Sequence, residues 1–192
     1  MITCEEKESI SSFDNYDVST LLENTEALFK QRCASARDVV EFLEKHPEVE
    51  EVFHPSSPRH VDSQIAKSQY KLHGSLLSFR LKNAVDEHQV SHFCNVLAAT
   101  TLFRYALSFD GLVSKVNHHT TVSEFFTPPG KLRSLNIDRL VRLAIGTEDS
   151  QDLKRALTWA LDNWQKISIS DAEAFADQRA ARFQDNSKRV RG

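Results

Sequence analysis

The stretch Leu140-Val141-Arg142-Leu143-Ala144-Ile145 runs directly into Gly146-Thr147-Glu148-Asp149, and this change from apolar to polar residues decides the fold. An apolar run of this length, bounded by a glycine, predicts a strand over 140–145. Glu148 and Asp149 then begin a segment in which apolar residues recur every three or four positions as far as Trp164, and this predicts a helix. The chain is therefore expected to combine α and β structure in one domain.

Arg142 is the unusual residue of this strand. Alternation along a strand places Val141 and Leu143 on one face and Arg142 on the other. Arginine is rarely buried without a partner, and its planar fork binds a carboxylate through two parallel hydrogen bonds. Spacing alone leaves two interpretations equally open. Arg142 either binds the carboxylate of a ligand or pairs with an acid of its own domain.

Outward from this strand, apolar periodicity predicts further elements on both sides. A long helix is expected from Asp17, as its N-cap, to His46, because Pro47 disfavours helical geometry in the residue before it. The other expected elements are strands at 49–53, 75–81 and 102–107, helical segments at 63–70 and 85–99, and a long connection at 108–137. The predicted fold is α+β, with a small, mainly antiparallel sheet and helices on one face. The expected organisation is a polar lead-in at 1–16, one domain at 17–167 and a helical, basic tail at 168–192.

Long connections without regular structure are often functional, so residues 108–137 are a candidate site. Ser108 and Ser114 are hydroxyl residues around Gly111 that could face a ligand, although capping serines of an ordinary turn are favoured. His118 and His119 form either a ligand pair or, as favoured, a polar rim. On the helix at 85–99, His88 and His92 have metal-ligand spacing, but an exposed pair is favoured and no metal site is predicted.

Composition excludes several classes of function. The net charge of -3 gives no general attraction to nucleic acid or to an anionic membrane. No stretch approaches the ~20 apolar residues that span a bilayer, and Met1 to Ser9 is too acidic for a secretory signal. The three cysteines, Cys4, Cys33 and Cys94, form no disulfide framework. A cytoplasmic protein is expected.

Several stretches, taken in order, resemble one family of enzymes. They are Val39-Val40-Glu41-Phe42-Leu43-Glu44-Lys45-His46-Pro47-Glu48-Val49, Val52-Phe53-His54-Pro55-Ser56-Ser57-Pro58, Gly74-Ser75-Leu76-Leu77-Ser78-Phe79, Ser108-Phe109-Asp110-Gly111-Leu112-Val113-Ser114 and the stretch from Leu140 to Asp149. Together they are similar to the C-terminal domain of the pyridoxal-phosphate-dependent enzymes of cysteine and methionine metabolism. This group includes cystathionine γ-synthase and the cystathionine lyases, which have fold type I. The resemblance covers roughly residues 17–165.

The resemblance implies two substrate-binding residues. Arg142 corresponds to the arginine that clamps the substrate α-carboxylate, and Ser108 to a serine near the cofactor lysine and the substrate. Asp110 departs from the family, which has a glycine there, and an acid at this place would repel a carboxylate. Pyridoxal phosphate is the cofactor implied, yet this chain shows neither the family's S-x-T-K lysine motif nor a glycine-rich phosphate loop. No catalytic or cofactor-binding residue is therefore assigned.

Two functions follow from the resemblance. In the first, the chain is part of a transsulfuration enzyme, inactive alone, whose partner is a cofactor-bearing N-terminal half or a second copy of itself. In the alternative, it is a degenerate, non-catalytic domain that acts as a protein-interaction module. Whether the chain itself is an enzyme stays open at this point.

Overall fold

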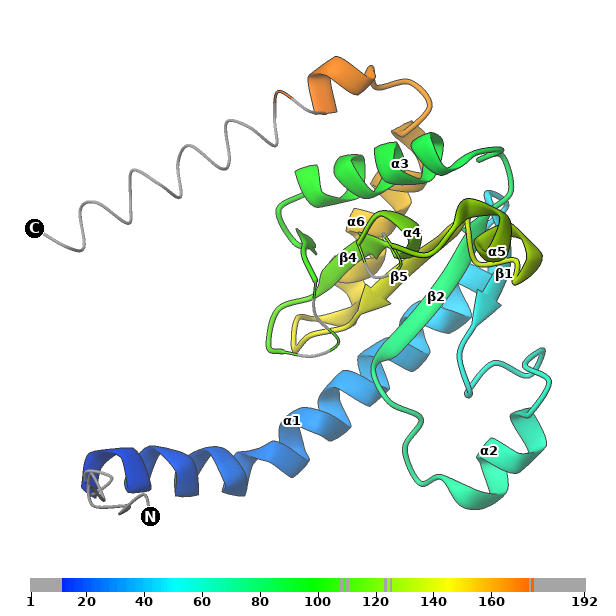
Figure 1. The fold of residues 1–192 in the computed structure, drawn as a ribbon. Helices are drawn as coiled ribbons and strands as arrows, with labels where there is room; N and C mark the ends of the chain where they lie inside the picture. Colours follow the sequence, from blue (N-terminus) through cyan, green and yellow to red (C-terminus); the bar gives the residue numbers. More distant parts are fainter. Residues whose placement is uncertain are drawn as a thin grey trace, which may run out of the picture.

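The computed structural model describes residues 12–107, 109, 111–122, 124, 126–172 and 174 (Figure 1). The elements are α1 (Ser12–Lys45), β1 (Val49–Phe53), α2 (Ser63–Gln69), β2 (Leu76–Leu81), α3 (Glu87–Ala99), β3 (Arg104–Tyr105), β4 (Lys115–His118), α4 (His119–Val122), α5 (Pro129–Ser134), β5 (Leu140–Ala144) and α6 (Ser150–Asn163). No helix among these residues has the length and apolarity needed to cross a membrane.

The five strands form one sheet in the order β1-β2-β5-β4-β3. Three neighbouring pairs are antiparallel, and β3 with β4 is parallel. The predicted α+β fold with a mainly antiparallel sheet is therefore confirmed. β5, the strand that contains Arg142, is the central strand of the sheet.

One face of the sheet is apolar and carries the core. Phe79, Val116, Val141 and Leu143 are fully buried on this face. The helices α1, α3 and α6 cover it, and they contribute most of the remaining core side chains. Alternation in the strands leaves the opposite face to more polar residues. The expectation of long helices on one face is confirmed.

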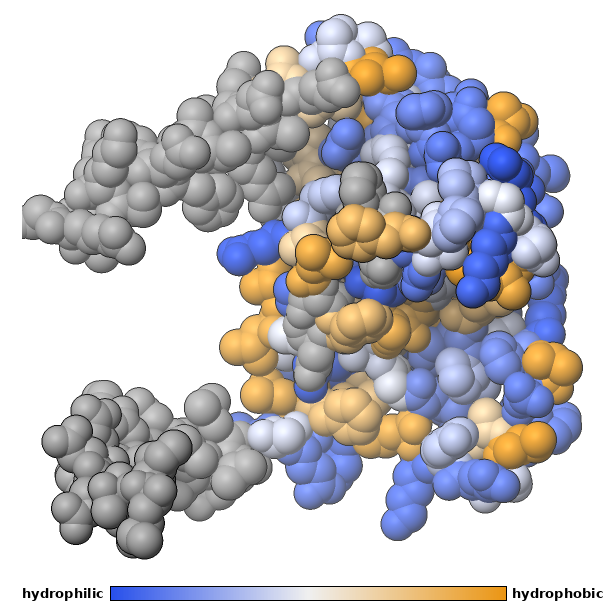
Figure 2. All heavy atoms as spheres, viewed as in Figure 1, coloured by the Kyte–Doolittle hydropathy of each residue, from blue (hydrophilic) through white to orange (hydrophobic). Residues whose placement is uncertain are grey.

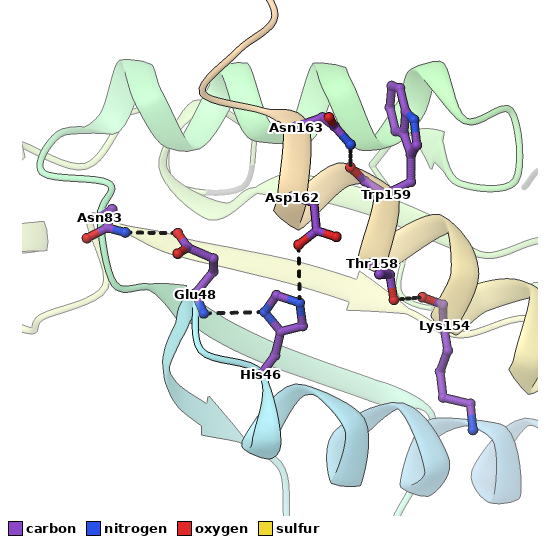
Figure 3. A network of polar contacts seen from close by, with 8 residues as sticks. All are labelled: His46, Glu48, Asn83, Lys154, Thr158, Trp159, Asp162 and Asn163. Atoms are coloured by element: carbon purple, nitrogen blue, oxygen red, sulfur yellow. Dashed lines mark hydrogen bonds and ion pairs between the residues drawn. The ribbon is translucent and has the colours of Figure 1, made fainter.

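The end of α1 agrees with the prediction made from Pro47. The helix ends at Lys45, and His46 then accepts a hydrogen bond from Glu48 N at Nδ1, 3.3 Å away. His46 Nε2 lies 3.9 Å from Asp162 Oδ1 of α6, and Asn83 Nδ2 donates to Glu48 Oε2 at 2.9 Å (Figure 3). The junction between α1 and β1 is thus joined to both α6 and the turn after β2.

The start of α1 differs from the prediction. Asp17 is not an N-cap, because the helix already includes Ser12. Residues 12–16 contain neither glycine nor proline, so nothing in their backbone chemistry ends the helix at Asp17. The proposed boundary between lead-in and domain, and the tail at 168–192, remain predictions. Most of that tail lies outside the described residues.

The connection at 108–137 is more regular than predicted. It contains β4, α4 and α5, so the expectation of a structureless loop was wrong. β4 has only four residues, which is too short for its apolar alternation to be recognised in the sequence. The strand is stabilised by its pairing with β5, which no local pattern predicts. The strand predicted at 102–107 shortens to Arg104–Tyr105, because Thr101 has a positive φ of 65° and Phe103 turns into the core.

Candidate carboxylate-binding site

Arg142 lies in the middle of a polar row that crosses three strands. In the register of the sheet it stands opposite Ser78 of β2 on one side and Asn117 of β4 on the other. This row is on the face opposite the helices. Arg142 is only 3% exposed and Asn117 only 1%. The sequence placed Arg142 on the face away from Val141 and Leu143, and the structure confirms this.

Phe109 and Asn117 are neighbours of Arg142 on this face of the sheet. The ring of Phe109 lies 4.2 Å from the guanidinium carbon, a cation–π contact, while the ring itself is exposed. Burial lowers the pKa of Arg142, although the group remains a cation. Nδ2 of Asn117 donates to the Ala106 carbonyl at 3.1 Å, and its Oδ1 is buried without a hydrogen-bond partner among the described residues.

Glu148 and Asp110 are two candidates for an acid of the same domain that would pair with Arg142, and Glu148 is bound elsewhere. Its Oε1 accepts from Ser114 N at 2.7 Å and its Oε2 accepts from Ser114 Oγ at 2.8 Å. The other acid, Asp110, lies outside the described residues, as does Ser108, the second substrate-binding residue. The assignments of Arg142 and Ser108 to the substrate therefore remain proposals.

Ser114 holds the loop beside Arg142 in place, which is a structural role. Besides binding Glu148, its Oγ accepts from Gly146 N at 2.8 Å, and Thr147 N donates to the Leu112 carbonyl at 2.9 Å. From the other side, Arg32 of α1 donates to the Gly111 carbonyl at 3.3 Å. The loop at 111–114 is thus fixed between α1 and the end of β5.

Gly146 is the position at which this arrangement is most sensitive. A Cβ there would lie 2.5 Å from Leu112 O and 2.6 Å from Ser114 N, both backbone atoms. We expect Gly146→Ala to lower the free energy of unfolding by about 1–3 kcal/mol, measured by urea unfolding. Gly130→Ala is the matched control, because a Cβ at Gly130 meets nothing within 4 Å. An equal loss in the two variants would contradict the proposed close approach.

The histidines differ from their predicted positions. His118 is fully buried: Nε2 donates to Asp138 O at 2.8 Å, and Nδ1 contacts Ser91 Oγ at 2.9 Å. The polar-rim interpretation was wrong for it, because the register of β4 turns it to the core face. The exposed-pair interpretation was wrong for His92, whose Nε2 bonds to the carbonyls of Trp164 and Ile167. No group of three potential metal ligands occurs among the described residues.

His118 predicts a dependence of stability on pH. Burial lowers the pKa of His118 below its ordinary value of 6.5, so the unfolded chain binds this proton more readily than the folded one. Stability is therefore full above about pH 6.5 and is lost as the pH falls towards the lowered pKa. We expect His118→Gln to reduce this loss by an amount on the order of 1 kcal/mol, measured by urea unfolding at pH 7.5 and 5. His88→Gln, at an exposed position, should retain the slope of the parent chain.

Comparison with known proteins identifies relatives of this chain. The family described as Cys/Met metabolism PLP-dependent enzyme matches residues 8–162. Cystathionine β-lyase of Coxiella burnetii is 31% identical over 150 residues, which are 78% of this chain and 38% of that protein. L-methionine γ-lyase of Porphyromonas gingivalis is 29% identical over 160 residues, covering 81% of this chain and 38% of that protein. The chain therefore spans well under half the length of these relatives.

Solved structures show the same fold. Cystathionine γ-synthase from Xanthomonas oryzae pv. oryzae, in complex with cystathionine, matches with a TM-score of 0.69 at 24% identity, over 81% of this chain and 39% of that one. The named relatives are enzymes, which favours the enzyme-fragment interpretation over an interaction module. The chain belongs to the family of pyridoxal-phosphate-dependent enzymes of cysteine and methionine metabolism, of which it represents a part.

Proposed function

We propose that this chain supplies the substrate-carboxylate side of a pyridoxal-phosphate-dependent active site that acts on a sulfur amino acid of the cystathionine type. The observation that carries the proposal is the position of Arg142, buried in the centre of a polar row on the sheet face away from the helices. Ser108 is the second substrate-binding residue of the proposal, by its resemblance to the family motif.

The chemistry required of Arg142 is orientation. Two parallel N–H donors fix a carboxylate in one plane, and in a dry site such charge-assisted bonds are strong. Asn117 Oδ1, an acceptor in the same row, can receive an N–H of the bound amino acid. The Phe109 ring limits access of water to the guanidinium. These groups bind and orient an amino acid, and none of them is assigned a proton-transfer step.

The residues of this site do not by themselves fit the cofactor. Pyridoxal phosphate supplies the electron sink of this family's chemistry when it is bound. Lys115 lies near the row, but its Nζ donates to the Val113 carbonyl at 3.2 Å. The five glycines of the chain are too widely spaced for a glycine-rich phosphate loop. We propose that the cofactor lysine and the phosphate-binding groups come from a separate cofactor domain.

Exposed apolar side chains mark where that domain would dock. Tyr105, Leu107, Phe109 and Leu112 are exposed around the β3–β4 connection, next to Arg142. Figure 2 shows hydrophobic groups gathered along the left edge of the described part, where Figure 1 draws this connection. Exposed apolar clusters of this kind mark interaction sites. The partner is a cofactor-bearing domain or a second copy of the chain, in the cytoplasm, where the buried thiols of Cys33 and Cys94 stay reduced.

The proposal that a separate domain holds the cofactor is testable on the isolated chain. Purified protein is mixed with pyridoxal phosphate, reduced with borohydride and mapped by mass spectrometry. We expect scattered labelling of exposed lysines and no stoichiometric adduct. A single lysine labelled in full would show that the chain holds the cofactor itself and would overturn the proposal that a separate domain holds it.

A second experiment uses a chimera, in which the chain replaces the matching segment of the Coxiella burnetii relative. Cystathionine cleavage by this chimera should be retained.

A further inference from the structure

A basic cavity lies apart from the Arg142 site. It has a volume of about 250 Å³ and opens between α1, the turn after β1, α2 and the segment before β2. None of its lining residues belongs to the polar row or to the loop at 111–114. Its lining, all of it within the described part of the chain, includes no carboxylate. The charged and imidazole groups that line it are Lys30, Arg37, Lys67, Lys71, His54 and His73.

Three of the cations form no salt bridge with an acid in the described part of the chain. Lys30 forms an ion pair with Glu26 at 2.6 Å, one turn earlier on α1. Among the described residues, no salt bridge involves Arg37, Lys67 or Lys71. Like charges gathered around one cavity repel each other, and this repulsion is relieved when an anion enters. The cavity thus carries a net positive charge that its own walls do not balance.

Two imidazole side chains, those of His54 and His73, also line the cavity. His54 is 1% exposed, and its Nδ1 accepts from Ser56 N at 3.1 Å. The neutral ring therefore carries its proton on Nε2, which is buried without a hydrogen bond of ordinary geometry, although the Gly74 carbonyl lies near the ring. His73 Nε2 is also buried without a hydrogen-bond partner among the described residues. Buried donors of this kind are costly unless an acceptor meets them.

We propose that this cavity binds a phosphate group, either as free phosphate or as a small phosphate monoester. A phosphate carries close to two negative charges and several strong acceptor oxygens, which match the three cations Arg37, Lys67 and Lys71 better than a single carboxylate would. The cavity volume of about 250 Å³ is sufficient for a phosphate group, because it is several times the roughly 30 Å³ that one water molecule takes in the liquid. The site is independent of the function proposed for Arg142.

The test is a calorimetric titration of the full chain with inorganic phosphate at constant ionic strength, with acetate as the reference anion. A second arm uses phenyl phosphate, to distinguish free phosphate from an ester. We expect saturable binding of at least one of the two, and no saturable binding of acetate. The double variant Lys67→Gln/Lys71→Gln should bind at least tenfold more weakly.

The matched control is Lys131→Gln/Lys166→Gln, which removes the same charge at two exposed lysines that do not line the cavity. It should bind phosphate as the parent chain does. Circular dichroism checks that both double variants retain the fold. The proposal is overturned if neither phosphate compound binds saturably, if acetate binds equally well, or if the control loses as much affinity as the cavity variant.

Discussion

Arg142→Lys should lower kcat/KM for cystathionine by about tenfold to a hundredfold in the chimera described above. A lysine keeps the charge but cannot reproduce the two parallel hydrogen bonds of the guanidinium fork. Hydrogen bonds to charged groups contribute roughly 1.5–3 kcal/mol, and about 1.4 kcal/mol corresponds to a factor of ten. Arg142→Ala should lose at least as much. The melting temperature of the isolated chain should change little in either variant.

Arg80 provides the matched control on the same face of the neighbouring strand. It is as buried as Arg142, and within the chain its Nη1 donates to Glu51 at 2.8 Å and its Nη2 donates to the Asn136 carbonyl at 2.8 Å. Arg80→Lys should therefore lower the melting temperature and leave the KM for cystathionine unchanged. If the Arg142 variants instead melt several degrees lower and bind the amino acid normally, Arg142 is a residue of the fold and its proposed role as the clamp is wrong.

Phe93→Ala should cause the largest loss of stability, about 3–5 kcal/mol. Phe93 is fully buried on α3, between Phe79 of β2 and Trp164 at the end of α6. Both ring pairs are edge-to-face, with centroids 5.9 and 6.3 Å apart. This one side chain thus joins the sheet to two helices, and its removal leaves a cavity between them.

Urea unfolding of the isolated chain measures this effect. Phe126→Ala is the control, because Phe126 is 95% exposed and its loss removes little buried area. The control should change the free energy of unfolding by less than about 0.5 kcal/mol. A loss at Phe93 no larger than that at Phe126 would show that the aromatic cluster does not hold α3 to the sheet.

The long helix, β1, β2, β5 and α6 could be predicted because each carries its own signal in adjacent residues. Pro47 ends α1, and Asp149 caps α6 by accepting from Gln151 N. Alternation along β5 placed Arg142 on the correct face. Local chemistry of this kind needs no knowledge of the rest of the chain. Most of the family motifs overlap these same segments, the exception being Ser108 to Ser114 in the β3–β4 connection. This overlap is why the sequence led to the family.

β4 could not be predicted, and the composition of the site depends on it. Its register with β5 buries His118 and sets Asn117 beside Arg142, although these residues lie far from Arg142 in the sequence. Pairing between distant strands is fixed by packing and by backbone hydrogen bonds that no local pattern records. Ser114 is a hydroxyl residue that could face a ligand, but in the structure it donates hydrogen bonds to Glu148. This contact also joins residues distant in the sequence, which no local pattern records.

The sequence by itself determined the fold class, the strand at 140–145 and the arginine on its polar face, because strand alternation and helix periodicity are properties of neighbouring residues. Only the tertiary structure decided which side chains surround that arginine and which cations share the basic cavity. Lys67 and Arg37 line one cavity from different helices, 30 positions apart in the chain. Proximity of this kind arises when helices and loops pack, and it is not a property of any single segment.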